Sequence, residues 1–141
     1  MRLEIAAICE AATEQGGKLN MLGAFDTLYA SAFPHTLPQC TFVFRIRFNR
    51  AESGDHSIKL TLKDSNGVPL IPEMNAKVPI TIQEGSDGRV GNILMNVHGL
   101  KFQNPGYHAV DLSLDGTHTI SLPIRVLEVN PQQPPMSPGE L

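Results

Sequence analysis

The chain has 141 residues, of which 41% are hydrophobic and 18% are charged. This is the length of one globular domain, and it is long enough to bury a core without help from metals or disulfides. A net charge of −3 provides no general attraction to nucleic acid or to an anionic membrane, so we expect neither as a partner.

The first segment, LEIAAICEAATEQGG (3–17), fits two interpretations. It contains good helix formers, and its two glycines are suited to terminating a helix. Apolar residues also occupy alternate positions, which is typical of a strand with one buried face: Leu3, Ile5, Ala7 and Cys9. We favour the strand, because a single terminal helix would need its own groove on a closed sandwich.

The sequence gives no sign of export. Glu4 and Glu10 interrupt the N-terminal apolar stretch, which therefore lacks the continuous hydrophobic region of a secretory signal. No run reaches the roughly 18 apolar residues of a membrane-spanning helix. Cys9 and Cys40 lack metal-ligand spacing, and without an export signal free buried thiols are favoured over a disulfide. We expect a cytoplasmic protein.

Alternation of apolar and polar residues predicts several further strands. It is clearest in TFVFRIRF (41–48), where one face carries only large apolar side chains: Phe42, Phe44, Ile46 and Phe48. The same pattern occurs at 18–25, 56–63, 78–82 and 90–99. In the last of these, Leu94 falls among the polar positions and blurs the alternation. In 18–25, Gly23 marks a bulge or a close approach.

Turn sequences separate these strands. D-S-N-G at 64–67 and L-D-G at 114–116 are hairpin signals, and E-G-S-D-G at 84–88 joins two more strands. Turns at this density predict an all-β, antiparallel sandwich of about seven to nine short strands. We place this domain at residues 1–129 and expect the proline-rich segment 130–141 to be a disordered tail.

The register of the last hairpin decides the role of two histidines. A two-residue Asp115-Gly116 loop would set the apolar residues of the two strands on opposite faces, so the loop must contain three residues. Taking 114–116 as that loop places residue 112 opposite His118. His108 and His118 then share the inner face several pairs apart, cannot bind one metal ion, and are expected to be partly buried.

The same reasoning applies to the other hairpin and to the remaining histidines. A three-residue loop at 65–67 sets Leu62 opposite Leu70, which keeps both side chains on the apolar face. His56 and His98 lie at or beyond the ends of the predicted strands, so we expect both at the surface.

No motif with a known catalytic or cofactor-binding mechanism occurs in the chain. We therefore expect no cofactor and no metal, and we favour a protein that is not an enzyme. The alternative is a small enzyme or small-molecule binder whose site lies in loops 31–39, 49–57 and 84–91. Such a site would draw on His35, His56 or Arg89.

One surface feature suggests a binding site. If strand 41–48 pairs with 56–63, their outward faces bring four basic side chains together: Arg45, Arg47, Lys59 and Lys63. Like charges on adjacent strands repel one another unless an anionic group neutralises them. We interpret these residues as a basic patch for the acidic surface of a partner protein. The simpler interpretation is a solvated face neutralised by neighbours such as Glu52 or Asp55.

Pro123 suggests a second kind of contact. A proline inside ISLPIRVLEV (120–129) cannot donate a backbone hydrogen bond, which predicts that this strand lies at a sheet edge. Edges are either protected or used for strand addition. The leading hypothesis is therefore a non-catalytic binding or assembly module that acts through a sheet face, an edge strand or loop tips. Its partner would be a protein with an acidic surface or a second copy of itself.

Three segments resemble a bacterial family of unknown function: residues 17–48, 63–70 and 104–116. The shared features are G-K-L at 17–19, G-A-F-D at 23–26, Pro34 before a strand, and P-G-Y followed by the Asp-Gly hairpin. Together they span most of residues 3–126. The resemblance implies an all-β, immunoglobulin-like sandwich, and it brings neither an activity nor functional residues.

Overall fold

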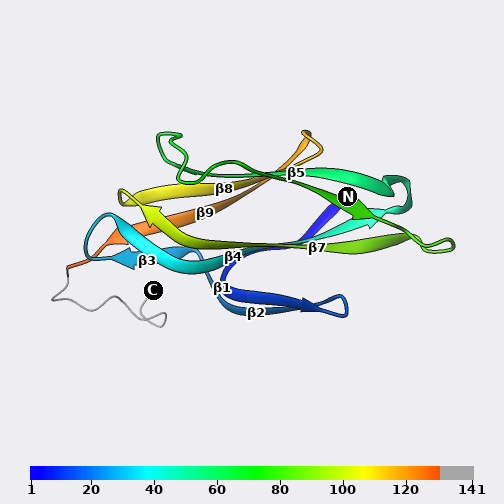
Figure 1. The fold of residues 1–141 in the computed structure, drawn as a ribbon, viewed down its shortest axis with the longest axis horizontal. Helices are drawn as coiled ribbons and strands as arrows, with labels where there is room; N and C mark the ends of the chain where they lie inside the picture. The colour runs from blue at the N-terminus through cyan, green and yellow to red at the C-terminus, as the bar shows by residue number, and fades with distance from the viewer. Residues whose placement is uncertain (131–141) are drawn as a thin grey trace.

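The computed structural model describes residues 1–130, and it is built from strands (Figure 1). The predicted disordered tail begins at residue 130, and its residues 131–141 lie outside the described part of the chain. The described chain contains nine strands: β1 Arg2–Gln15, β2 Lys18–Phe25, β3 Thr27–Ala30, β4 His35–Asn49, β5 Gly54–Asp64, β6 Met74–Ile80, β7 Gly88–Phe102, β8 Gly106–Leu114 and β9 His118–Glu128. A short 3-10 turn, Arg50–Glu52, joins β4 to β5.

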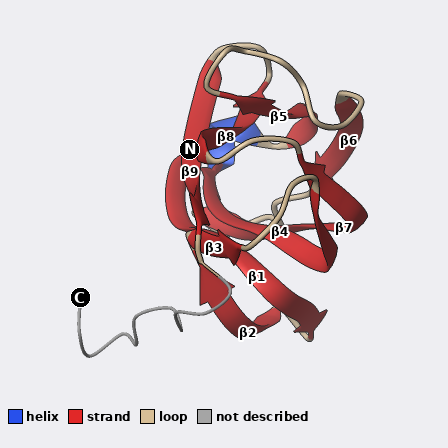
Figure 2. Ribbon diagram, turned by 90° about the vertical axis from the view of Figure 1, so that its left-hand side faces the viewer, coloured by secondary structure: helices blue, strands red, loops and turns tan. Residues whose placement is uncertain are grey.

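The strands form two sheets that pack face to face. One sheet has the order β2-β1-β4-β7 and the other β3-β9-β8-β5-β6. Figure 1 shows β5, β8 and β9 in a layer above β4 and β7, and Figure 2 shows both sheets around one interior. Every strand pair in residues 1–130 is antiparallel except β3 with β9. The predicted all-β sandwich is confirmed, and its immunoglobulin-like arrangement stays a prediction.

The core lies between the sheets and follows the predicted alternation. The apolar face of β4 is buried completely, and it meets inward side chains of β5 and β8 such as Leu60 and Leu112. Val43 is an exception, because it lies on the outward face of β4 and is nevertheless fully buried. The outer face of this sheet must therefore be covered at that point.

The covering element is the β1–β2 hairpin. β1 pairs with β4 from Arg2 to Cys9 and with β2 from Ile8 to Gln15, so the predicted N-terminal strand is confirmed. The tip of the hairpin returns over the outer face of the sheet, where the carbonyl oxygen of Gly17 accepts hydrogen bonds from the side chains of Arg45 and Asn92, each at 3.4 Å. Figure 1 shows the hairpin as a separate layer below β4 and β7.

The two predicted hairpin registers have different outcomes. The 65–67 loop is confirmed, because the amide of Leu70 donates to the carbonyl oxygen of Leu62 at 2.9 Å. The β8–β9 loop does contain three residues, but they are 115–117, so Leu114 rather than Leu112 lies opposite His118. Asp115 and Gly116, the first two residues of this loop, both adopt positive φ angles, 52° and 71°.

Two prolines fit the positions that they occupy. The predicted connection 31–39 is shorter than expected, because β4 already begins at His35. Pro38 is tolerated there since β1 pairs with β4 only up to Thr41, which leaves one side of the strand open. At Pro123 the strand is indeed an edge, because β3 pairs with β9 only from Arg125 onward.

Candidate functional site

The predicted basic patch does not form. β4 belongs to one sheet and β5 to the other, so the predicted pairing of these two strands is wrong. Arg45 and Arg47 therefore do not lie beside Lys59 and Lys63. The 3-10 turn between the strands carries the chain from one sheet to the other, and no alternation pattern signals such a change.

Arg45 and Arg47 instead share a carboxylate on the neighbouring strand. The Nε atom of Arg45 lies 3.1 Å from Glu4 and that of Arg47 lies 2.7 Å away, while Arg2 approaches the same side chain at 3.4 Å. The pairing register shifts between Leu3 and Ile5, which sets Glu4 between them at the irregularity. The Arg47 hydrogen bond, supported by Arg45 and opposed by burial, lowers the pKa of Glu4 to about 2.

The two lysines also have an acidic neighbour. Lys59 lies 3.3 Å from Glu73, and both residues border a groove of about 400 Å³ that also contains Lys63 and Asp111. Two basic and two acidic side chains line this groove. The two lysines therefore lie on a surface of mixed charge, beside Glu73 and Asp111 and away from Arg45 and Arg47.

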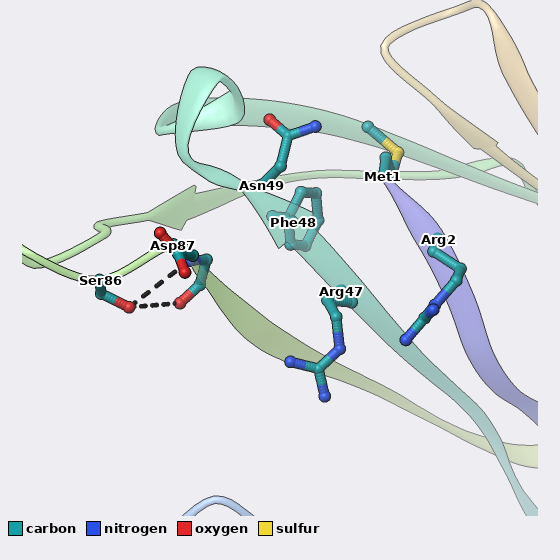
Figure 3. A pocket seen from close by; sticks show the side chains of 8 residues that line it. Met1, Arg2, Arg47, Phe48, Asn49, Ser86 and Asp87 are labelled. Atoms are coloured by element: carbon teal, nitrogen blue, oxygen red, sulfur yellow. Dashed lines mark hydrogen bonds between the residues drawn. The ribbon is translucent and has the colours of Figure 1, made fainter.

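A pocket of about 480 Å³ lies where β1 begins and β4 ends (Figure 3). Its lining combines both charges with an aromatic ring: Arg2, Arg47, Phe48, Asn49, Ser86 and Asp87. Loops 49–57 and 84–91 meet here because Asn49 pairs with Gly88, whereas His35 pairs with Phe102 at the opposite end of the same strands. The three loops of the alternative hypothesis therefore do not converge on one site.

His56 is buried, contrary to the prediction that it lies at the surface. Its Nδ1 atom lies 2.6 Å from a carboxylate oxygen of Asp115, and its Nε2 atom lies 2.6 Å from the carbonyl oxygen of Glu52. The ring also stacks at 4.7 Å from the ring of Phe48. His56 thus joins the 3-10 turn to the β8–β9 loop across the end of the sandwich.

This geometry leaves His56 no free nitrogen. Both ring nitrogens face oxygen atoms that can only accept, so the ring donates to both when it is protonated. Burial disfavours the charge, but the hydrogen bonds to Asp115 and to the Glu52 carbonyl outweigh it and raise the pKa of His56. The His56 hydrogen bond in turn lowers the pKa of Asp115, against a smaller effect of burial. The pair is a structural clamp rather than a general base.

The other histidines and the cysteines have structural positions. His108 is buried against the edge of the Phe102 ring, as predicted, whereas His118 is exposed rather than partly buried. His98 is exposed, as predicted. Cys9 and Cys40 are free and buried, which confirms the sequence interpretation, and burial raises the pKa of Cys40 to about 11. A thiol of that pKa is a poor nucleophile near neutral pH.

Most of the sheet edges in residues 1–130 carry a feature that discourages pairing with another chain. β6 contains Lys77 and Pro79, β9 contains Pro123 on its open side, and β3 has only four residues. β2 is interrupted by Gly23, whose φ of 66° and close approach to the side chain of Glu10 break the regular edge. Charged residues, prolines and short strands are the usual means of edge protection.

β7 lacks this protection between Val90 and Val97; beyond that stretch, Gly99 interrupts the edge with a φ of 65°, as Gly23 does in β2. The strand β7 has 15 residues and pairs with β4 alone, in an uninterrupted register from Gly88 to His98. Between residues 90 and 97 it contains neither a charged residue nor a proline. Leu94, which blurred the predicted alternation, lies on the outer face of this strand and is only partly buried.

Residues 1–130 contain neither a metal-binding cluster nor a membrane-spanning helix. No three side chains of the metal-binding types lie close enough together to hold an ion. The described part of the chain also lacks any helix with the length and apolar character needed to cross a bilayer.

The two packed sheets define a two-layer, mainly antiparallel β-sandwich protein. The chain belongs to the family of unknown function DUF6941, whose model matches residues 4–127. This confirms the predicted membership of a family of unknown function. No curated protein matches the chain in sequence.

Solved structures share the fold at low identity. A β-glucosidase from Listeria innocua in complex with gluconolactone matches 89% of this chain with a TM-score of 0.50 and 12% identity, and the match spans 16% of the enzyme. The C-terminal domain of wzt matches 96% of this chain and 83% of its own length, with a TM-score of 0.46 and 13% identity. At 12% identity, the match to the β-glucosidase supports a shared fold and nothing more. The match to the wzt domain, with a TM-score of 0.46, supports no further conclusion.

Proposed function

We propose that this protein is a non-catalytic binding module of the bacterial cytoplasm that pairs with an extended protein segment at the edge of β7. The observation that carries this proposal is the contrast between β7 and the protected edges of β2, β3, β6 and β9. An unpaired edge offers a row of backbone donors and acceptors to any strand that can approach it.

The side chains of β7 suit such a partner. Ile93, Met95 and Val97 face the interior, so an added strand with apolar residues at alternate positions would extend the core sideways. Leu94 faces outward beside the buried Val43 and gives the partner an apolar contact on the second face. Backbone pairing would supply the affinity, and these side chains of β7 would determine which partner sequences bind.

The state of the titratable residues also favours binding over catalysis. Both ring nitrogens of His56 make structural contacts, and the two buried thiols, Cys9 and Cys40, have raised pKa values. Glu4 is held by arginines with a pKa near 2, too low for a general base at neutral pH. None of these groups is poised for acid–base or nucleophilic chemistry.

A peptide-selection experiment tests the proposal. We expect a random peptide library to yield extended peptides that bind the wild-type protein and protect amides of 88–98 from hydrogen exchange. A Leu94→Lys variant should bind them at least about tenfold more weakly, because it adds a charge to the centre of the edge.

Leu22→Lys is the matched control, since Leu22 is 68% exposed on another edge strand, and it should leave the affinity unchanged. The proposal is wrong if no peptide distinguishes the two variants, or if the selected peptides protect amides elsewhere.

A further inference from the structure

We infer that the pocket beside His108 binds a small molecule that carries both an ammonium and a carboxylate group, as a free amino acid does. The pocket has a volume of about 200 Å³ and lies where the loop that follows β5 meets the connection from β7 to β8. Figure 1 shows both connections at the end of the sandwich where β7 ends. Drug-sized sites have roughly 300–1,000 Å³, so this pocket is suited to a ligand of few atoms.

His108 supplies the first polar contact for such a ligand. Its side chain is only 3% exposed, and its ring packs at 5.0 Å against the ring of Phe102. Nδ1 lies 3.2 Å from the carbonyl oxygen of Gly106, which can only accept, so this nitrogen carries the proton of the neutral ring. Nε2 is then an acceptor that makes no hydrogen bond within residues 1–130, although it is not sealed from solvent. Because His108 lines the pocket, a donor bound there can satisfy this nitrogen.

Asp64 supplies a second acceptor beside the first. It lies directly opposite His108 in the β5–β8 pair, so the two side chains point to the same side of the sheet, and both line the pocket. Its Oδ1 atom accepts hydrogen bonds from the amides of Asn66 and Val68, each at 2.9 Å, whereas its Oδ2 atom has no such partner in the described chain. An ammonium group suits this pair of acceptors, because it donates up to three hydrogen bonds and carries the charge opposite to Asp64.

Lys101 lines the same pocket with the opposite charge. It is exposed, and within the described residues it forms no ion pair, not even with Asp64. The carboxylate and the ammonium of the protein thus border one space without neutralising each other. A ligand that offers a carboxylate to Lys101 and an ammonium to Asp64 would neutralise both, which a simple cation or anion would not.

The remaining wall of the pocket favours an aliphatic ligand. It includes Val68, Pro69 and Leu70 from the loop that follows β5, and Val68 is 55% exposed. Covering this apolar surface removes it from water and adds to the affinity. We therefore expect amino acids with small aliphatic side chains to bind more tightly than those with charged side chains.

Calorimetric titration with the twenty amino acids tests the ligand class. For the amino acid that binds most tightly, two further probes are the amine that lacks its carboxylate and the carboxylic acid that lacks its ammonium group. We expect each probe to bind at least about tenfold more weakly than the amino acid, because each loses one charge-assisted contact. The inference is wrong if no amino acid binds, or if either probe binds as tightly as the complete molecule.

Two variants test the assigned contacts. Lys101→Gln should weaken binding of the amino acid about tenfold and leave the amine probe bound no more weakly, because only the carboxylate contact is lost. Lys63→Gln is the matched control, since it removes the same charge from an exposed lysine that does not line this pocket, and its affinity should equal that of the wild type. His108→Phe keeps an aromatic ring against Phe102 but removes Nε2, so it should weaken the amino acid and the amine alike.

Thermal unfolding without ligand shows whether the His108→Phe protein folds, and the two lysine variants decide the question if it does not. Equal affinities of the Lys101→Gln and Lys63→Gln proteins would overturn the inference. The site uses none of residues 88–98, so its failure would leave the proposed pairing at the β7 edge untouched.

Discussion

Replacing Phe44 with alanine should lower the free energy of unfolding by about 3–5 kcal/mol, the range for truncating a buried aromatic side chain. Phe44 is completely buried, and it lies between Ala6 of β1 and Ile93 of β7 on the core face of the central strand β4. The loss combines the lost burial with the cavity that remains, because neighbouring strands in a paired sheet cannot collapse into the space.

Denaturant unfolding followed by far-ultraviolet circular dichroism measures this change. Leu22→Ala is the matched control, because Leu22 is 68% exposed and its truncation should change stability by no more than about 0.5 kcal/mol. A loss of similar size in both variants would show that Phe44 does not lie in the shared core.

The second large effect is expected at the clamp between His56 and Asp115. Asp115→Ala should destabilise the protein by about 1–3 kcal/mol, because it leaves the buried His56 ring and the amide of Ser57 without their acceptors. Asp115 also has a φ of 52°, a conformation that alanine tolerates poorly. Asp115→Asn tolerates this backbone, but it removes the charge and replaces one of the two accepting oxygens with an NH2 donor, so only one of the two contacts keeps its acceptor.

The clamp should make stability depend on pH in a defined direction. The pKa of His56 is raised above its ordinary 6.5 in the folded protein, so its contribution is complete below 6.5 and is lost as the pH rises through the raised value. The pKa of Asp115 is lowered from 3.8, so its contribution is present above 3.8 and is lost as the pH falls through the lowered value. The clamp is therefore strongest between these limits.

Unfolding measurements at a series of pH values check this prediction. The difference in stability between the wild type and Asp115→Asn should be largest between pH 3.8 and 6.5 and should shrink at higher pH. A difference that stays constant from pH 5 to 9 would contradict the assigned roles of His56 and Asp115.

The strands themselves could be predicted from the sequence, because alternation depends only on which side chains face the core. The alternate apolar residues of two strands are buried as their spacing indicates: Phe42, Phe44, Ile46 and Phe48 in β4, and Ile58, Leu60 and Leu62 in β5. The distribution of strands between the two sheets could not be predicted in this way. β4 and β5 are consecutive and both alternate, and three residues of 3-10 turn decide that they lie in different layers.

The failures at His56 and the basic patch have the same origin. Asp115 reaches His56 only because the β8–β9 loop folds beside β5, and Glu4 reaches Arg45 only because β1 pairs with β4. Both contacts join residues that are at least 41 positions apart in the chain. Leu94 did carry a local signal, since an apolar residue at a polar position marks the outer face of the open edge.

The difference between the two edges of the four-stranded sheet also limits the size of any assembly that the protein forms. A chain that adds a neighbour at one side of its sheet can form either a closed pair or an endless filament, depending on whether the opposite side accepts a neighbour too. Here the far side of the same sheet is β2, where Gly23 interrupts the strand. Any assembly made through β7 should accordingly stop after one step, as a discrete particle rather than a fibre.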